Sequence, residues 1–178
     1  MRIGIDISQL AYENTGVANY LQELVENLIK LDKKNEYILF FSSLRKKMPI
    51  FAKALVKDNE NVKVKTSRYP STLLDVFWNK LHIMPIEELI GDVDVFISSD
   101  WTQPPSKRAK KVTILYDLIV YRYPEETHTK IVHTQRRRLN WVKKECDLIL
   151  CISESTKQDA IDILGIPEEK LKIIYPGI

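Results

Sequence analysis

Four short segments of the sequence carry residue types whose chemistry suits a small anionic or hydroxylated ligand. The first is Thr15-Gly16-Val17, at the start of a predicted helix. A helix start offers free backbone N–H groups and the positive end of the helix dipole, and a glycine lets an anion approach closely. We therefore predict a phosphate contact at Gly16 and Val17. The alternative is a glycine that only backbone geometry requires.

The second segment, Tyr116-Asp117, follows a predicted buried strand and precedes a loop that contains Arg122. A carboxylate at a strand end can accept hydrogen bonds from hydroxyl groups, as the recognition of a sugar requires. An aspartate at this place can instead cap the turn. Asp117 is therefore a candidate for ligand binding, with turn capping as the alternative.

The third and fourth segments combine ligand-binding groups with local structural roles. Ser153-Glu154-Ser155 lies between a predicted strand and a predicted helix, so Ser153 can cap that helix and still contact a ligand. Ser98-Ser99-Asp100-Trp101 places a carboxylate and an aromatic ring in one loop. Aromatic faces stack on sugar rings, although this tryptophan can also serve packing.

The motifs of the common nucleotide-binding and metal enzymes are missing. No phosphate-binding glycine loop ends in Lys-Ser/Thr, and no Gly-x-Gly-x-x-Gly follows the first strand. No His-Glu-x-x-His or paired Cys-x-x-Cys is present, and the histidines His82, His128 and His133 are scattered. We expect neither a resident cofactor nor a metal ion.

Length and composition indicate one globular domain. The chain has 178 residues, of which 44% are hydrophobic and 29% charged, and we assign residues 1–178 to a single domain. No apolar run is long enough to cross a bilayer and no signal-peptide core opens the chain, so we expect a cytoplasmic protein. A formal charge of +3 is too small to indicate nucleic-acid binding.

Strand-like and helix-like segments alternate along the chain. Short apolar runs predict strands at residues 2–8, 36–42, 62–66, 93–98, 112–116, 147–152 and 172–175. Apolar spacings of three and four predict helices from 15–16 onward and over 51–57, 129–145 and 154–164, with a less regular helix between Pro70 and Pro85. The alternation predicts an α/β, Rossmann-like, mostly parallel sheet with helices on both faces. Ligands should then bind at the strand ends, in segments 8–16, 98–103, 116–124 and 152–155.

The predicted helix at 129–145 is rich in cations. Helical spacing places Val132, Leu139, Val142 and Cys146 on an inner stripe, and Lys130, Arg137, Trp141 and Lys144 on an outer one. A cationic stripe with a tryptophan suits an anionic lipid surface. We hypothesise that this helix contacts the inner face of the membrane; a solvated helix face is the alternative.

Taken in order, these segments resemble the N-terminal domain of glycosyltransferase family 4, whose members have the two-domain GT-B fold. The resemblance is carried by MRIGIDISQL, TGVANYLQELVENL, VTILYDLIVYRYPEE and, most specifically, DLILCISESTKQDAIDILGIPEEKLKIIYPGI. It implies transfer of a sugar from a nucleoside diphosphate sugar to an acceptor hydroxyl, with retention of configuration and without a metal. It also implies that a C-terminal domain, absent from these 178 residues, holds most of the donor nucleotide.

The resemblance also assigns roles to individual residues. It places the Gly16 amide against the donor diphosphate, where the amide stabilises the growing charge of the leaving group. Tyr116 and Asp117 stand where many members have a His-Asp pair, and a tyrosine cannot carry a proton near neutral pH. We assign catalytic roles to Asp117 and Tyr116, donor contacts to Gly16, Val17, Ser153 and Glu154, and substrate contacts to Asn19, Asp100, Trp101 and Arg122.

The expected function is thus the acceptor-binding half of a nucleotide-sugar-dependent glycosyltransferase. A glycan or a lipid-linked acceptor is the expected partner, and the isolated half is expected to be inactive because most of the donor site is elsewhere. Two alternatives stay open. One is a non-catalytic Rossmann-like domain that binds a sugar or organises an assembly, and the other is half of a sugar-nucleotide epimerase.

Overall fold

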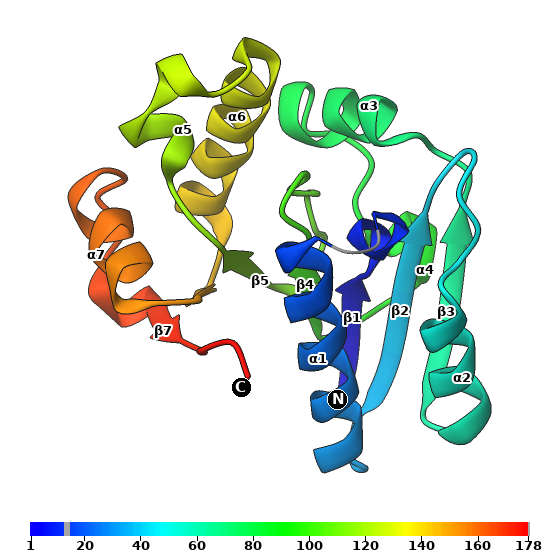
Figure 1. The fold of residues 1–178 in the computed structure, drawn as a ribbon. Coiled ribbons are helices and arrows are strands. Elements are labelled where there is room, and N and C mark those ends of the chain that lie inside the picture. The colour runs from blue at the N-terminus through cyan, green and yellow to red at the C-terminus, as the bar shows by residue number, and fades with distance from the viewer. Residues whose placement is uncertain (13–14, 178) are drawn as a thin grey trace.

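A seven-stranded parallel sheet forms the centre of the protein (Figure 1). The computed structural model describes residues 1–12 and 15–177; Glu13, Asn14 and Ile178, which belong to the predicted 8–16 loop and the closing segment, lie outside the described residues. The strands are β1 (Arg2–Asp6), β2 (Glu36–Ser42), β3 (Val62–Ser67), β4 (Val95–Ser98), β5 (Lys110–Leu115), β6 (Leu148–Cys151) and β7 (Leu171–Ile173). Their order is β3-β2-β1-β4-β5-β6-β7, with every neighbouring pair parallel. The predicted Rossmann-like α/β fold is confirmed.

Helices cover both faces of this sheet (Figure 1). One face carries α1 (Gly16–Leu31) and α2 (Ile50–Asp58). The other carries α3 (Ser71–Leu74), the π-helical turn η2 (Asp75–Lys80), α4 (Glu87–Ile90), α6 (Thr129–Glu145) and α7 (Glu154–Asp162). The connections contain α5 (Ile119–Arg122) and the 3-10 turns η1 (Ser8–Ala11), η3 (Pro124–Glu126) and η4 (Glu168–Lys170).

The helix α1 packs against the sheet through regularly spaced apolar residues. Its buried residues recur every three or four positions, at Ala18, Leu21, Val25 and Ile29. They share one core cluster with inward-facing residues of β1 and β2, and burial of such a stripe supplies most of the stability of a helix in a protein. Thr15 begins the helix by accepting a hydrogen bond from the Ala18 amide (3.2 Å). The start of α1 is thereby held beside the loop that follows β1.

The helix predicted between Pro70 and Pro85 ends earlier than expected, at Lys80. Trp78 is fully buried, and its indole N–H donates a hydrogen bond to the Met84 carbonyl (2.9 Å). This bond turns the chain back, and His82 and Met84 adopt left-handed φ values of 53° and 63°. Pro85 also disfavours the helical conformation at the residue before it. The turn leaves Lys80 at the exposed end of η2.

The strand order creates a crevice beside β1. The strand has β2 on one side and β4 on the other, and the order runs outward from β1 in both directions. In open parallel sheets, ligands bind outside the carboxyl ends of the strands at such a reversal point. The strands also pack tightly below this point, since a Cβ on Gly4 would lie 2.8 Å from both Ile90 Cδ1 and Phe96 Cδ2.

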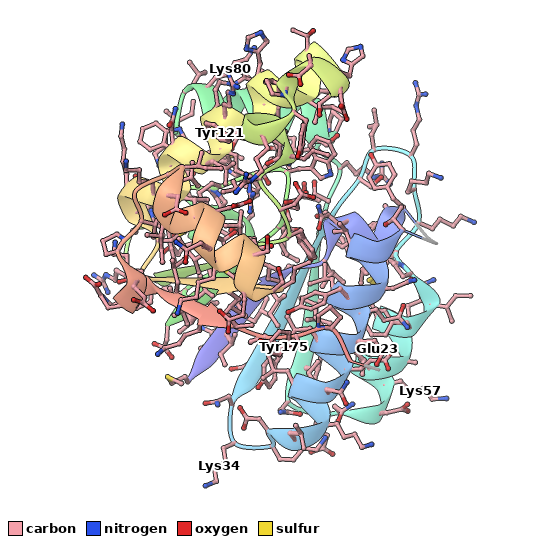
Figure 2. All side chains as sticks on the ribbon, turned by 60° about the vertical axis from the view of Figure 1, so that its left-hand side comes forward. Glu23, Lys34, Lys57, Lys80, Tyr121 and Tyr175 are labelled. Carbon is pink, nitrogen blue, oxygen red and sulfur yellow. The ribbon has the colours of Figure 1, made fainter. Side chains whose placement is uncertain are left out.

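The C-terminal segment of the chain runs beside α1. The Tyr20 hydroxyl donates a hydrogen bond to the Ile174 carbonyl (2.9 Å). Figure 2 shows the adjacent Tyr175 next to the same helix, near Glu23. This contact joins α1 to the segment that follows β7.

Candidate functional site

A pocket of about 700 Å³, here called the crevice pocket, opens at the carboxyl ends of β1 and β4. Its walls come from the loops after these two strands, from the start of α1, from α3 and η2, and from the first turns of α6. A neighbouring pocket of about 460 Å³ shares part of this lining, including Gln9 and Trp101. The two segments predicted to hold a ligand after β1 and β4 therefore do meet at a hollow.

Gly16 stands at the start of α1, where its contacts with the described residues do not explain why it is a glycine. Apart from its chain neighbours and the backbone of its own helix, no described atom lies within 4 Å of the place of a Cβ, and its φ lies outside the left-handed range that favours glycine. Neither packing among the described residues nor backbone geometry therefore requires a glycine. The exposed helix start leaves room for an anion, and the adjacent Val17 lines the crevice pocket.

Asp100 and Trp101 both line the crevice pocket. The Asp100 carboxylate accepts hydrogen bonds from Arg138 Nη1 and from Gln135 Nε2, each at 3.4 Å. Burial raises the pKa of Asp100, Arg138 lowers it, and the nearby Asp117 carboxylate raises it again. Both hydrogen bonds are long, so the carboxylate keeps lone pairs for a ligand hydroxyl.

Arg138 is a residue of the site that the sequence analysis missed. It belongs to a run of cations typical of a solvated helix face, yet it is 1% exposed. Its guanidinium donates to the Thr113 hydroxyl (2.8 Å) and to the Ile114 carbonyl (3.2 Å), both on β5, and it pairs with Asp100. The sequence could have indicated this burial, because Arg138 directly precedes Leu139 and lies on the side of the helix that carries the apolar stripe.

Two buried amide side chains, Gln9 in the lining of the crevice pocket and Asn79 behind its Trp101 loop, were also missed. Gln9 is 5% exposed, and its Oε1 has no hydrogen-bond partner among the described residues. Asn79 donates to the Trp101 carbonyl (2.9 Å) and accepts from the Gln103 amide (3.0 Å). These bonds fix the loop that presents Asp100 and Trp101. Sequence offers no signal for them, because the partners lie more than twenty residues apart.

Tyr116 and Asp117 have different environments. Tyr116 is 8% exposed, and its ring meets Tyr20 edge to face with centroids 5.5 Å apart. Burial raises the pKa of Tyr116, and the Asp100 carboxylate raises it further. The hydroxyl therefore keeps its proton near neutral pH and cannot act as a base. Asp117 is exposed and accepts a hydrogen bond from the Ile119 amide (3.1 Å), which is turn-capping geometry. Both residues lie outside the lining of the crevice pocket.

The other residues assigned from the sequence stand apart from the crevice pocket. Ser153 caps α7 by accepting a backbone hydrogen bond (3.1 Å), and Glu154 is exposed at the start of that helix. Arg122 forms an ion pair with Asp159 of α7, with Nε 2.8 Å from Oδ2. Asn19 is exposed on α1. The assigned residues that line the pocket are Val17, Asp100 and Trp101.

The outer stripe predicted for α6 is wrong in two of its members. Arg137 pairs with Asp75 of η2 (2.9 Å), and the Trp141 ring stacks on His82 with centroids 3.6 Å apart. Both half-buried side chains thus contact η2 and the turn after it, which pack along α6. The inner stripe is confirmed, with Val132, Leu139, Val142 and Cys146 all buried.

Searches of residues 1–12 and 15–177 for two other features gave negative results. Within these ranges, no group of three or more His, Cys, Asp or Glu side chains is placed to hold a metal ion. No helix in the same part of the chain combines the length and the apolar character needed to span a bilayer.

The family model described as Glycosyltransferase Family 4 matches residues 14–178. No curated protein matches the chain. The matched range contains Gly16, Asp100, Trp101 and Asp117, and leaves out only those residues of the site that follow β1.

Proposed function

Because the chain belongs to glycosyltransferase family 4, we propose that it binds the acceptor in a sugar transfer from a nucleoside diphosphate sugar to a hydroxyl group. The fold is that of the family's N-terminal domain, and the match supports a transferase over a sugar-binding module or an epimerase half. Retention of configuration and independence of metal are parts of the proposal. So is a second domain, outside these 178 residues, that binds most of the donor nucleotide and closes over the crevice pocket.

The open start of α1 is the observation that carries this proposal. Apart from its chain neighbours and its own helix backbone, Gly16 has no described neighbour that excludes a side chain, which supports the approach of a ligand as the reason for its small size. A helix of sixteen residues places roughly half a positive charge at this end. As the donor bond breaks, negative charge grows on the diphosphate. The Gly16 amide stabilises that charge and so lowers the barrier.

The crevice pocket supports the acceptor side of the proposal. Its volume of about 700 Å³ lies within the range of small-molecule sites. Asp100 supplies a hydrogen-bond acceptor for a substrate hydroxyl, and Trp101 supplies an aromatic face. The acceptor in this proposal is a glycan or a lipid-linked sugar at the cytoplasmic side of the membrane.

The tyrosine at position 116 shapes the proposed mechanism. Its buried hydroxyl has no hydrogen-bond partner among the described residues and a raised pKa, so we give it no role as a base. We propose instead that the leaving diphosphate takes the proton of the acceptor hydroxyl. Asp117, close enough to Asp100 to raise its pKa, contributes a second carboxylate for substrate hydroxyls.

Transfer assays on the complete enzyme test this proposal. A panel of labelled nucleoside diphosphate sugars is offered with membrane extract as the acceptor source, in the presence of a chelator. We expect one donor to be consumed and a product with retained anomeric configuration; an inverted product or strict loss of turnover with the chelator would contradict the mechanism. Turnover by the 178-residue chain alone would contradict the proposal that a second domain is needed to bind the donor.

Asp100 provides a sharper test of the acceptor site. The variant Asp100→Asn keeps the size of the side chain but weakens its hydrogen bonds to hydroxyls. We expect a higher KM for the acceptor and an unchanged KM for the donor. Asp92→Asn, at an exposed position before β4, removes the same charge and serves as the control. Equal acceptor KM values for the two variants would remove Asp100 from the acceptor site.

A further inference from the structure

Two lysines of the crevice pocket have no acidic partner in the part of the chain that the structure describes. Lys80 from η2 and Lys130 from α6 line the pocket, and no acid among the described residues lies within ion-pair distance of either. The two acids of the pocket lining are each paired with an arginine of α6. The first turn of α6, which contributes to the wall, contains no acidic residue, so the helix N-terminus adds positive potential. The pocket therefore suits a ligand with a negatively charged group.

The buried part of the pocket offers hydrogen bonds that the chain leaves unused. Gln9 is 5% exposed and lines the pocket, and its Oε1 has no partner among the described residues. The hydrogen bonds that the Asp100 carboxylate accepts from Gln135 and Arg138 are both long, at 3.4 Å. A buried acceptor without a partner is costly unless a ligand supplies the donor. Both groups are acceptors, and hydroxyl groups are their natural donors.

Apolar side chains complete the lining. Trp101 is half-buried, whereas Tyr12 is 54% and Ile131 is 37% exposed at the same pocket. Exposed apolar side chains gathered around a hollow mark a binding surface. An aromatic face beside hydrogen-bond acceptors is the combination that holds a sugar ring by its C–H face and its hydroxyls.

We propose that the acceptor bound in the crevice pocket is a sugar with an anionic substituent, either a phosphate or a carboxylate. The ring lies on Trp101, its hydroxyls donate to Gln9 and Asp100, and the anionic group reaches Lys80 and Lys130. This inference rests on the proposed acceptor role and adds the chemical class of the acceptor. Its test measures binding without a donor, so its failure is distinguishable from a failure of transfer.

NMR titration of the ¹⁵N-labelled 178-residue chain provides the test. The indole N–H groups of Trp78 and Trp141 donate to backbone carbonyls, whereas among the described residues that of Trp101 has no acceptor. The Trp101 indole signal, identified with Trp101→Phe, is therefore the reporter. The probes are α-D-glucose 1-phosphate, D-glucuronic acid, methyl α-D-glucoside and inorganic phosphate. We expect at least one of the two anionic sugars to shift the reporter at concentrations where the neutral glucoside and phosphate do not.

Charge-removing variants complete the design. The double variant Lys80→Gln/Lys130→Gln should weaken binding of the anionic sugar about tenfold, because each exposed charge contributes modestly. The control Lys34→Gln/Lys57→Gln removes the same charge at positions far from Lys80 in Figure 2 and should leave the affinity unchanged. A shift by only one of the two anionic sugars supports the proposal and identifies the substituent.

Four results would overturn the proposal. They are equal binding of the neutral glucoside, the same shift with inorganic phosphate alone, no shift with any sugar up to tens of millimolar, and an undiminished affinity in the double variant at Lys80 and Lys130. The lysines are exposed, so the double variant is expected to keep the dispersed spectrum of the folded chain. Each outcome therefore reports on binding and not on folding.

Discussion

Substitution of Gly16 by valine separates a ligand role of this position from a structural one. The added side chain enters space in which no described atom, other than those of its chain neighbours and its own helix backbone, lies within 4 Å of the new Cβ. In the first turn of α1, valine is a better helix former than glycine by up to about 0.5 kcal/mol. The free energy of unfolding of Gly16→Val is therefore expected to stay within about 0.5 kcal/mol of the wild-type value.

The effect on catalysis should be far larger. The methyl groups occupy the space proposed for the donor diphosphate and keep the Gly16 amide from its developing charge. Loss of one such backbone donor lowers kcat by about 10²–10³-fold, or about 2.7–4 kcal/mol. Gly16→Ala adds only a Cβ and should fall between the wild type and Gly16→Val.

The assay combines kcat of the complete enzyme at saturating donor and acceptor with urea unfolding of each variant. Glu23→Val places the same side chain on an exposed position of α1, away from the helix start, and is the control (Figure 2). A Gly16→Val enzyme with wild-type kcat would refute the diphosphate contact. A large drop in its unfolding free energy would show that Gly16 has the structural role that the open space argues against.

Three further perturbations test other parts of the structure. Gly4→Ala should lower the free energy of unfolding by about 1–3 kcal/mol, because its Cβ would meet Phe96 Cδ2 at 2.8 Å; an unchanged urea midpoint would contradict this. Burial alone would raise the pKa of Glu87, but hydrogen bonds from a serine hydroxyl and from backbone amides hold it at about 2, below its ordinary value of 4.5. A lowered carboxyl pKa stabilises the fold above the unfolded-state value, so the advantage over Glu87→Gln, at most about 3 kcal/mol at neutral pH, should disappear as the pH falls from about 4.5 to 2. A difference that is constant across this pH range, measured by urea unfolding, would exclude that origin. Trp141→Ala should cost about 2 kcal/mol or more of stability yet leave recovery with anionic vesicles unchanged in flotation, because the ring packs on His82; reduced recovery would restore the lipid hypothesis.

Local patterns in the sequence were enough for most secondary-structure elements. The predicted bounds of β2 (Glu36–Ser42) and α6 (Thr129–Glu145) agree with the structure, as does the start of α1 at Gly16. Apolar periodicity and capping residues act over a few neighbouring positions, so they can be read along the chain. The alternation of strands and helices then restricts the topology to a parallel sheet, and the strand ends indicate where ligands bind.

The composition of the crevice pocket was decided only by the tertiary structure. Lys80 and Lys130 lie fifty positions apart in the sequence, and both line the crevice pocket because η2 packs along α6. The same packing stacks the Trp141 ring on His82, and burial over β5 makes Arg138 a partner of Asp100 instead of a surface cation. A helical pattern shows which residues share a face, but the neighbours that cover that face are set by strand order. Which charges are neutralised and which are left for a ligand therefore depends on contacts between segments far apart in the chain.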